Sequence, residues 1–356
     1  METYIFILGR DPTLSILEII SYLQARNLNH QLHEHTEDYA AFSIQDFNPR
    51  HALEALGGTI KIARETSEFE EVYQGSENKV TYTVNKFTDN KKLVDDVEVQ
   101  LRTSLREQGL KAFQKKNREK KPSKSSTIDI EAVVAGERVG IVEAVSNPKA
   151  YKKRDENRPH FEAARVISMR LARILINLSQ AVPGDTLVDP FCGLGTILQE
   201  ATLMKIQAVG IDSNKTMITQ ATNNLQWLGT TTWKLYPGDA QALTGIIKHA
   251  DVAVTEPYLG PYAKKPLSMA EAQRLKLTLE QLYTTTLRQL KKIIKKRVVF
   301  IFPRFKTNEN KRVELDIPRI LRNSGWTIAD IHPGFTLPLP YYHTKSIIER
   351  FIYVLE

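Results

Sequence analysis

The chain has 356 residues, 42% of them hydrophobic and 25% charged, with a formal net charge of +8. These values are typical of a soluble globular protein with two or three domains and exclude global disorder, and the basic balance favours a polyanionic partner. One cysteine excludes an internal disulfide framework and a cysteine-rich zinc site, and the eight histidines show no metal-ligand spacing. We expect a cytoplasmic protein, because no apolar stretch approaches about 20 residues and the acidic start METYIFIL does not resemble a secretory signal.

The N-terminal part alternates short apolar runs with a helical pattern. Leu14, Leu17, Ile20 and Leu23 recur at helical spacing within LSILEIISYLQAR. The predicted strands and helices are, in chain order, 4–8, 14–26, 40–44, 49–56 and 59–65. HEH at 33–35 is expected in a solvent-facing loop. The pattern predicts a small α+β domain over residues 1–66.

A second α+β domain is expected over residues 67–148. KVTYTVNKF and two later apolar runs predict strands, and the last two runs are separated by AGE, a hairpin signal. The predicted elements are a strand at 79–87, a helix at 91–108, and strands at 126–134 and 138–145.

A basic run, KAFQKKNREKKPSKSS, lies between that helix and the hairpin, with seven Lys and Arg against one Glu. A run of this kind is often a solvated loop. The competing interpretation is contact with phosphates, since each neutralised phosphate releases counterions and adds affinity. The residues assigned to RNA binding in this interpretation are Lys115, Lys116, Lys120 and Lys121.

Residues 149–165 are expected to form a linker, because this stretch has many charges and no apolar period. Arg154 and Arg158 within it either touch an RNA backbone or join the linker to the following domain, and both alternatives stay open.

The C-terminal part, 166–356, begins with a predicted helix at 166–179 and then alternates strands with helices. This alternation predicts βαβ units and therefore an α/β fold with an open, doubly wound sheet. A C-terminal antiparallel hairpin, TIADIHPGF followed by SIIERFIYVLE, is expected to close the sheet. The predicted strands before it are TLVDPF (186–191), AVGIDS (208–213), WKLYPGDA (233–240), DVAVTEP (251–257) and RVVFIF (297–302).

Four features fall where these strands end, and ligands of open α/β sheets bind at that edge. DPFCGLG contains two glycines, which let a ligand approach the backbone, before a helix whose first N–H groups are unpaired. The next two strands end in Asp212 and Asp239, acids that could accept from ribose hydroxyls and from an adenine amino group, respectively. The fourth feature is TEPYLG, residues 255–260. Together they predict an adenosine site. Its predicted residues are Asp189, Phe191, Gly193, Gly195, Asp212, Asp239 and Ala240.

The third glycine of the dinucleotide fingerprint is absent, since Gln199 stands in its region. An acid at the start of the turn suits a cofactor with a cationic sulfonium and a free amino group. The interpretation is therefore S-adenosylmethionine, with Asp189 near its methionine end. Cys192 in the turn is interpreted as a packing residue, because no histidine nearby would activate it.

DPFCGLGTILQEA, Asp212, GDA and TEPYLG together resemble the class I methyltransferases that modify amino groups of nucleobases, above all the THUMP-containing tRNA guanine-N2 methyltransferases. The resemblance implies a ferredoxin-like N-terminal domain, a THUMP-like RNA-binding domain, a linker and a catalytic domain. It also implies tRNA as partner and methyl transfer to N2 of a guanosine, typically guanosine 10. Whether a small activator subunit is needed stays open.

TEPYLG departs from the hexapeptide of that family, T-D-P-P-Y-G. Glu256 replaces the aspartate, and Tyr258 carries the ring one residue early. An acid and a backbone carbonyl that accept both N–H bonds of an amine favour transfer, a proline aims the carbonyl, and a ring stacks on the base. Glu256, Pro257 and Tyr258 are therefore the predicted catalytic residues. Two alternatives stay open: a cofactor- or RNA-binding module without activity, and an amino-methyltransferase acting on rRNA, DNA or a protein.

Overall fold

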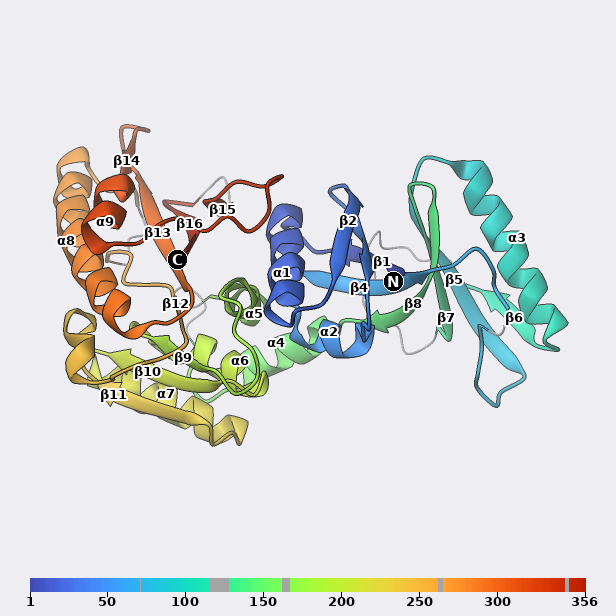
Figure 1. Ribbon diagram of the computed structural model, residues 1–356, viewed down its shortest axis with the longest axis horizontal. Coiled ribbons are helices and arrows are strands. Elements are labelled where there is room, and N and C mark those ends of the chain that lie inside the picture. Colours follow the sequence, from blue (N-terminus) through green and yellow to red (C-terminus); the bar gives the residue numbers. More distant parts are fainter. Residues whose placement is uncertain (71, 116–127, 162–166, 262–264, 343–345) are drawn as a thin grey trace. The chain divides into compact units, whose positions relative to one another are not determined.

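The computed structural model describes residues 1–70, 72–115, 128–161, 167–261, 265–342 and 346–356. The chain divides into two compact units (Figure 1). Unit 1 comprises Met1–Ile16 and Asn27–Lys152, and unit 2 comprises Leu17–Arg26 and Lys153–Glu356.

Unit 1 is built on one mixed sheet with the strand order β2-β3-β1-β4-β8-β7-β5-β6. The predicted domain boundary between residues 66 and 67 falls inside this unit. The sheet continues across it, because β4, before the boundary, pairs antiparallel with β8, after it. Its strands are β1 (Glu2–Leu8), β2 (His30–His35), β3 (Tyr39–Ile44), β4 (Thr59–Glu65), β5 (Lys79–Phe87), β6 (Lys111–Gln114), β7 (Ile130–Ala135) and β8 (Arg138–Val145). The helices of this part are α1 (Pro12–Ala25), α2 (Pro49–Ala55), α3 (Lys91–Glu107) and α4 (Pro148–Asn157), of which α1 and α4 run into unit 2.

Three of these elements differ from the sequence-based expectation. HEH lies in β2, an edge strand with alternating exposure, and not in a loop. The start of the basic run forms β6, which pairs with β5. Helix α4 occupies most of the expected linker, although none of its residues is buried. All three carry polar or charged side chains, so they lack the apolar periodicity on which the prediction depended.

Unit 2 has a sheet with the strand order β11-β10-β9-β12-β13-β16-β15, and β14 pairs with β13 (Figure 1). Strands β9 to β13 are parallel, and β16 is antiparallel to both of its neighbours. The strands are β9 (Thr186–Asp189), β10 (Gln207–Asp212), β11 (Trp233–Pro237), β12 (Val252–Thr255), β13 (Val298–Lys306), β14 (Arg312–Glu314), β15 (Leu339–Tyr341) and β16 (Ile348–Leu355). This is the predicted doubly wound, class I methyltransferase-like α/β fold with its C-terminal hairpin.

The sequence-based prediction gave β16 the wrong hairpin partner. β15 pairs with β16, whereas TIADIHPGF contributes no strand and only an isolated bridge between Ile328 and Leu355. The helical elements of unit 2 are α5 (Met169–Leu178), α6 (Thr196–Leu203), α7 (Lys215–Leu228), the 3-10 helix η1 (Ala240–Gly245), α8 (Met269–Ile293) and α9 (Ile317–Ser324).

The core of unit 2 holds the strand ends of the site in place. Tyr283 of α8 is fully buried and packs edge-on against Phe300 and Phe302 of β13. These rings belong to a cluster that includes Val188 of β9 and Ala253 of β12. Because the central strands are anchored in this cluster, the turns at their carboxyl ends start from fixed positions.

Candidate active site

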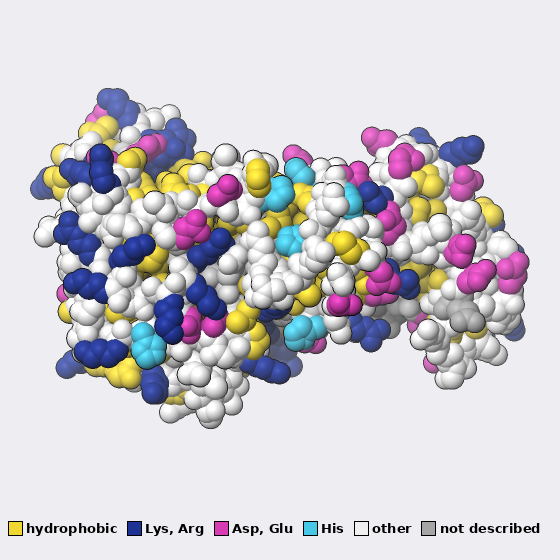
Figure 2. All heavy atoms as spheres, viewed as in Figure 1, with side chains coloured by type: hydrophobic (Ala, Val, Ile, Leu, Met, Phe, Trp, Pro, Cys, Tyr) yellow, Lys and Arg dark blue, Asp and Glu magenta, His cyan; other side chains and the backbone are white. Residues whose placement is uncertain are grey.

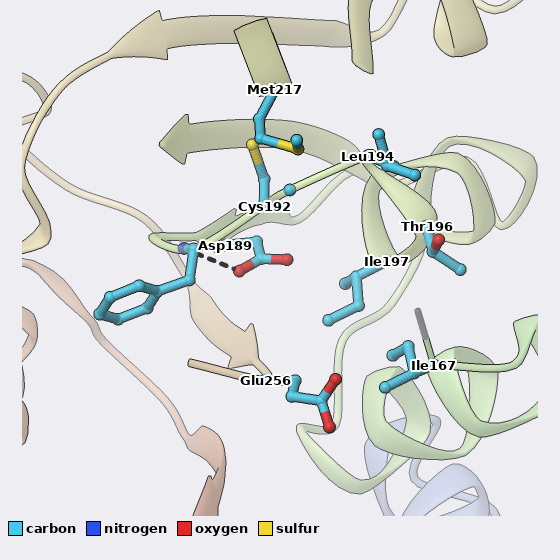
Figure 3. A pocket seen from close by; sticks show the side chains of 10 residues that line it. Ile167, Asp189, Cys192, Leu194, Thr196, Ile197, Met217 and Glu256 are labelled. Carbon is cyan, nitrogen blue, oxygen red and sulfur yellow. Dashed lines mark hydrogen bonds between the residues drawn. The ribbon is translucent and has the colours of Figure 1, made fainter. Parts of the chain in front are cut away.

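One pocket of unit 2 lies at the carboxyl ends of β9 and β12 (Figure 3). The empty space in and above it is about 520 Å³, open solvent included. Asp189 and Glu256 both line it, each directly at or after the end of its strand. The lining residues are Ile167, Asp189, Phe191, Cys192, Gly193, Leu194, Thr196, Ile197, Met217 and Glu256.

The turn between β9 and α6 depends on two glycines with left-handed backbone. Gly193 has φ +49° and Gly195 has φ +78°. A Cβ on Gly195 would also lie 3.3 Å from the Cβ of Ala221. Gly195 is the N-cap of α6 and supplies no side-chain cap, so the first N–H groups of that helix are free of capping at the pocket edge. The N–H groups in the first turn of α6 therefore begin without a side-chain cap beside the pocket. Their contact with a cofactor stays a prediction.

Asp189 is buried between the turn and the end of β12. Its Oδ1 accepts a hydrogen bond from the Thr255 hydroxyl at 2.7 Å. It also accepts one from the Phe191 amide at 3.1 Å, the dashed line in Figure 3. Burial raises the pKa of Asp189 to about 7, against the lowering effect of these two bonds. A neighbouring cation would favour its ionised form. The local chemistry thus suits a positively charged ligand group.

Asp212 ends β10 and is tied to the same turn. Its Oδ2 accepts from the Gly193 amide at 3.0 Å and its Oδ1 from the Asn214 amide at 2.8 Å. Each carboxylate oxygen has a second lone pair, so both can still accept from a ligand.

Asp239 follows β11 and caps η1 through a bond from the Gln241 amide at 2.8 Å. Its side chain is exposed, and the following Ala240 is buried. Neither residue lines the pocket described above. The predicted adenine contact of Asp239 stays a prediction beside its capping role.

Glu256 is the acid of TEPYLG, and the structure pairs it with a cation that the sequence did not suggest. The Arg350 Nε of β16 donates to its Oε1 at 2.5 Å. Burial raises the pKa of Glu256, and the charge and hydrogen bond of Arg350 oppose this rise. Arg350 could not be found from the sequence because it is 94 residues away and lies in an apolar strand pattern.

The rest of the hexapeptide is held mainly by its backbone. Pro257 is buried, and the Tyr258 carbonyl accepts the Tyr283 hydroxyl bond at 2.7 Å. The Tyr258 ring is 50% exposed and does not line the pocket, whereas Leu259 is buried. Gly260 has φ +110°, and a Cβ there would lie 2.7 Å from Leu275. The displaced ring therefore points away from the packed interior of the turn.

Of the six residues predicted to bind RNA, the structure describes Lys115, Arg154 and Arg158. Lys115 is exposed directly after β6, and Lys116, Lys120 and Lys121 lie outside the described residues. Arg154 donates to Glu200 at 2.8 Å, and the buried Arg158 donates to Thr196 of α6 at 2.9 Å. These contacts support the alternative that both arginines join this segment to the domain, and burial removes Arg158 from a surface where it would meet phosphates.

Cys192 is buried at the pocket, and burial raises the pKa of its thiol well above the ordinary value. A thiol kept protonated in this way is a poor nucleophile, which agrees with its interpretation as a packing residue. Within the described residues no cluster of three or more His, Cys, Asp or Glu could hold a metal ion. In the same part of the chain, no helix is long and apolar enough to cross a membrane.

Comparison with known families agrees with this geometry. Residues 156–314 match an RMKL-like methyltransferase domain. Residues 54–223, which begin in unit 1, also match a family described as DNA methylase. Both matches include the glycine turn, and the first also includes the TEPYLG turn.

Curated relatives match parts of the chain. A tRNA (guanine(10)-N2)-dimethyltransferase of Methanothermobacter thermautotrophicus is 37% identical over 33% of this chain and 34% of its own length. A protein of the same name from Pyrococcus abyssi is 28% identical over 58% of this chain and 55% of its own length. The chain thus spans about a third to a half of these two relatives.

A solved structure, TrmN from Thermus thermophilus, is similar over 99% of both chains, with a TM-score of 0.53 and 15% identity. At this identity the likeness concerns the fold. It covers both units.

Proposed function

We propose that this protein transfers a methyl group from S-adenosylmethionine to the exocyclic N2 amine of a guanosine in tRNA. The observation that carries the proposal is that one pocket is lined both by the glycine turn and by Glu256. A cofactor cradle and a carboxylate acceptor at one pocket are what transfer to an amine requires. The two curated relatives above are named for this reaction on tRNA.

The residues present fit this cofactor. A Cβ on Gly193 would meet nothing within 4 Å, so space is open beside the turn, and α6 begins without a side-chain cap. When bound, S-adenosylmethionine supplies an electrophilic methyl group on a cationic sulfonium. Asp189 would attract the cationic end. Burial disfavours its carboxylate form and raises its pKa to about 7, and a nearby cation stabilises that form. Asp212 would accept from the ribose hydroxyls and Asp239 from the adenine amino group of the bound cofactor. Phe191, Gly195 and Ala240 would hold it through their backbone.

Glu256 and the adjoining backbone carbonyl accept the two N–H bonds of the target amine. Accepting both bonds offsets the positive charge that develops on nitrogen as it reacts. Pro257 has no N–H and restricts the turn, which aims the preceding carbonyl. Tyr258, exposed beside the turn, stacks on the flipped base.

The remaining assignments concern the partner. Residues 67–148 act as the THUMP-like module that binds tRNA, with Lys115 and the basic run as phosphate contacts. The protein acts in the cytoplasm. Activity of the purified chain alone would show that no small activator subunit is needed.

The experiment supplies purified protein with labelled S-adenosylmethionine and, in parallel, bulk tRNA, rRNA or DNA. We expect label in tRNA, with N2-methylguanosine identified by mass spectrometry of the nucleosides. Cofactor binding without transfer to any of the three would favour the silent binding module. Transfer to rRNA or DNA alone would favour the alternative substrates, of which DNA has the support of the DNA methylase match.

Glu256→Gln tests the central assignment. We expect a loss of transfer on the order of 10²-fold or more with unchanged cofactor affinity, because the amide is a weaker acceptor than the carboxylate. Glu314→Gln is the matched control, since its side chain is 63% exposed on β14. Equal rates for wild type and Glu256→Gln would remove Glu256 from the chemistry.

A further inference from the structure

Strand β16 carries a cation to the edge of the candidate active site. Arg350 lies opposite Pro303 of β13 and Tyr341 of β15, so its backbone is held between two strands. Its Nε donates to Glu256 Oε1 at 2.5 Å, and the side chains are 31% and 13% exposed. This ion pair is partly shielded from water, which strengthens it relative to a surface pair.

We propose that Arg350 is a positioning residue, which keeps Glu256 ionised and fixes one of its oxygens so that the other meets the target amine. The inference deepens the proposed function and rests on it, because it gives Arg350 a task in the same transfer. Within the described part of the chain, Glu256 Oε1 is the oxygen that Arg350 engages, and Oε2 accepts no hydrogen bond. Glu256 itself faces the pocket (Figure 3).

A glutamate at this position needs such a partner. Its side chain has one more rotatable bond than aspartate, so an unrestrained carboxylate would sample several positions. A displacement of about 1 Å can cost on the order of 10²-fold in rate. The backbone of Arg350 is held in the sheet, so its hydrogen bond to Glu256 Oε1 restricts the rotation of the Glu256 carboxylate.

The charges around Glu256 point the same way. Asp189 of β9 and Tyr283 of α8 interact with it electrostatically, and both are acids whose ionisation would oppose its charge. Burial also disfavours the carboxylate, and Arg350 of β16 is the group that opposes these effects. Without Arg350, burial would act unopposed, and a larger fraction of Glu256 would be protonated at a given pH. A protonated carboxyl is a poorer acceptor for an N–H bond than a carboxylate.

The test compares Arg350→Met with Arg350→Lys in single-turnover methyl transfer to tRNA between pH 5.5 and 9, at saturating S-adenosylmethionine. For Arg350→Met we expect the acid limb of the rate profile to move up by about one pH unit or more, with partial recovery at pH 9. Arg350→Lys should keep the wild-type limb and lose rate only modestly. Arg312→Met is the matched control, since Arg312 of β14 pairs with Glu349 of β16 and not with Glu256.

A rate lowered by one constant factor at every pH, with the limb unmoved, would overturn the inference and leave Arg350 a structural role. Failure of the wild-type protein to methylate any nucleic acid would instead defeat the proposed function. In that case the pair is still tested by unfolding a double-mutant cycle of Arg350→Met and Glu256→Gln across pH. Coupling that is present at pH 8 and fades as Glu256 protonates supports the inference, and additive effects at every pH contradict it.

Discussion

Ionisation of the buried Asp189 carboxyl destabilises the folded protein when no ligand is bound. Its pKa is about 7 when folded and 3.8 in the reference state, so the folded chain binds the proton more tightly. The penalty for ionising it is absent below the reference pKa, grows as pH rises, and is complete above about pH 7. Asp189→Asn should therefore increase the free energy of unfolding at pH 8 by up to about 4 kcal/mol, with a smaller gain at pH 5. Denaturant unfolding at both pH values measures this.

The same change should weaken binding of S-adenosylmethionine, because the variant cannot supply a negative charge. Asp251→Asn is the control of opposite sign: Asp251 accepts from the Thr186 amide and pairs with Lys295, and its pKa is lowered. That variant should lose stability at neutral pH. A neutral or destabilising Asp189→Asn at pH 8 would contradict this account of the site.

At the scale of elements, one buried hydroxyl links α8 to the turn after β12. The Tyr283 hydroxyl donates to the Tyr258 carbonyl at 2.7 Å. Tyr283→Phe should cost about 1 kcal/mol of stability, because the carbonyl loses its partner. It should also slow methyl transfer while cofactor affinity is kept, since the turn carries Glu256 and not the glycine cradle.

Thr286→Val provides the comparison on the same helix. Thr286 is fully buried, and its hydroxyl has no hydrogen-bond partner within the described residues, so its loss should be neutral or stabilising. Thermal unfolding and single-turnover rates of both variants measure the difference. Equal effects would show that the Tyr283 bond does not hold the turn.

At the scale of the whole molecule, charge is the feature that extends over the surface. Lys and Arg side chains are spread over the visible face of unit 2 and do not gather in one patch (Figure 2). The basic run in unit 1 is therefore the more localised candidate for phosphate contact. Lys120→Ala with Lys121→Ala should lower tRNA affinity and reduce the salt dependence of binding, by a slope of about 1 to 2.

The control is a double change at two exposed lysines of unit 2, Lys248→Ala with Lys292→Ala. Filter binding of tRNA from 50 to 200 mM salt gives both slopes. Equal losses in the two doubles would indicate non-specific attraction to net charge, and the basic run would then be a solvated loop.

What could be predicted from the sequence was local. The apolar runs of unit 2, the glycine turn before Thr196 and the acids Asp189 and Asp212 at strand ends each depend on a few neighbouring residues. Periodicity and turn chemistry are written in such short segments. They were sufficient for the class I fold and for the edge of the sheet where the site lies. Polar elements such as β2 and α4 were missed because they carry no apolar period.

Only the tertiary structure decided which distant side chains meet. Pairing of β16 with β13 brings Arg350 to Glu256, and packing of α8 brings the Tyr283 hydroxyl to the Tyr258 carbonyl. It also buried Arg158, which the sequence left open as an RNA contact. These contacts are set by strand order and helix packing. Both depend on the free energy of the whole core, so the contacts cannot be derived from short segments. Glu256 could be identified as an acid from its own hexapeptide, whereas its ionisation and orientation depend on Arg350, 94 residues away.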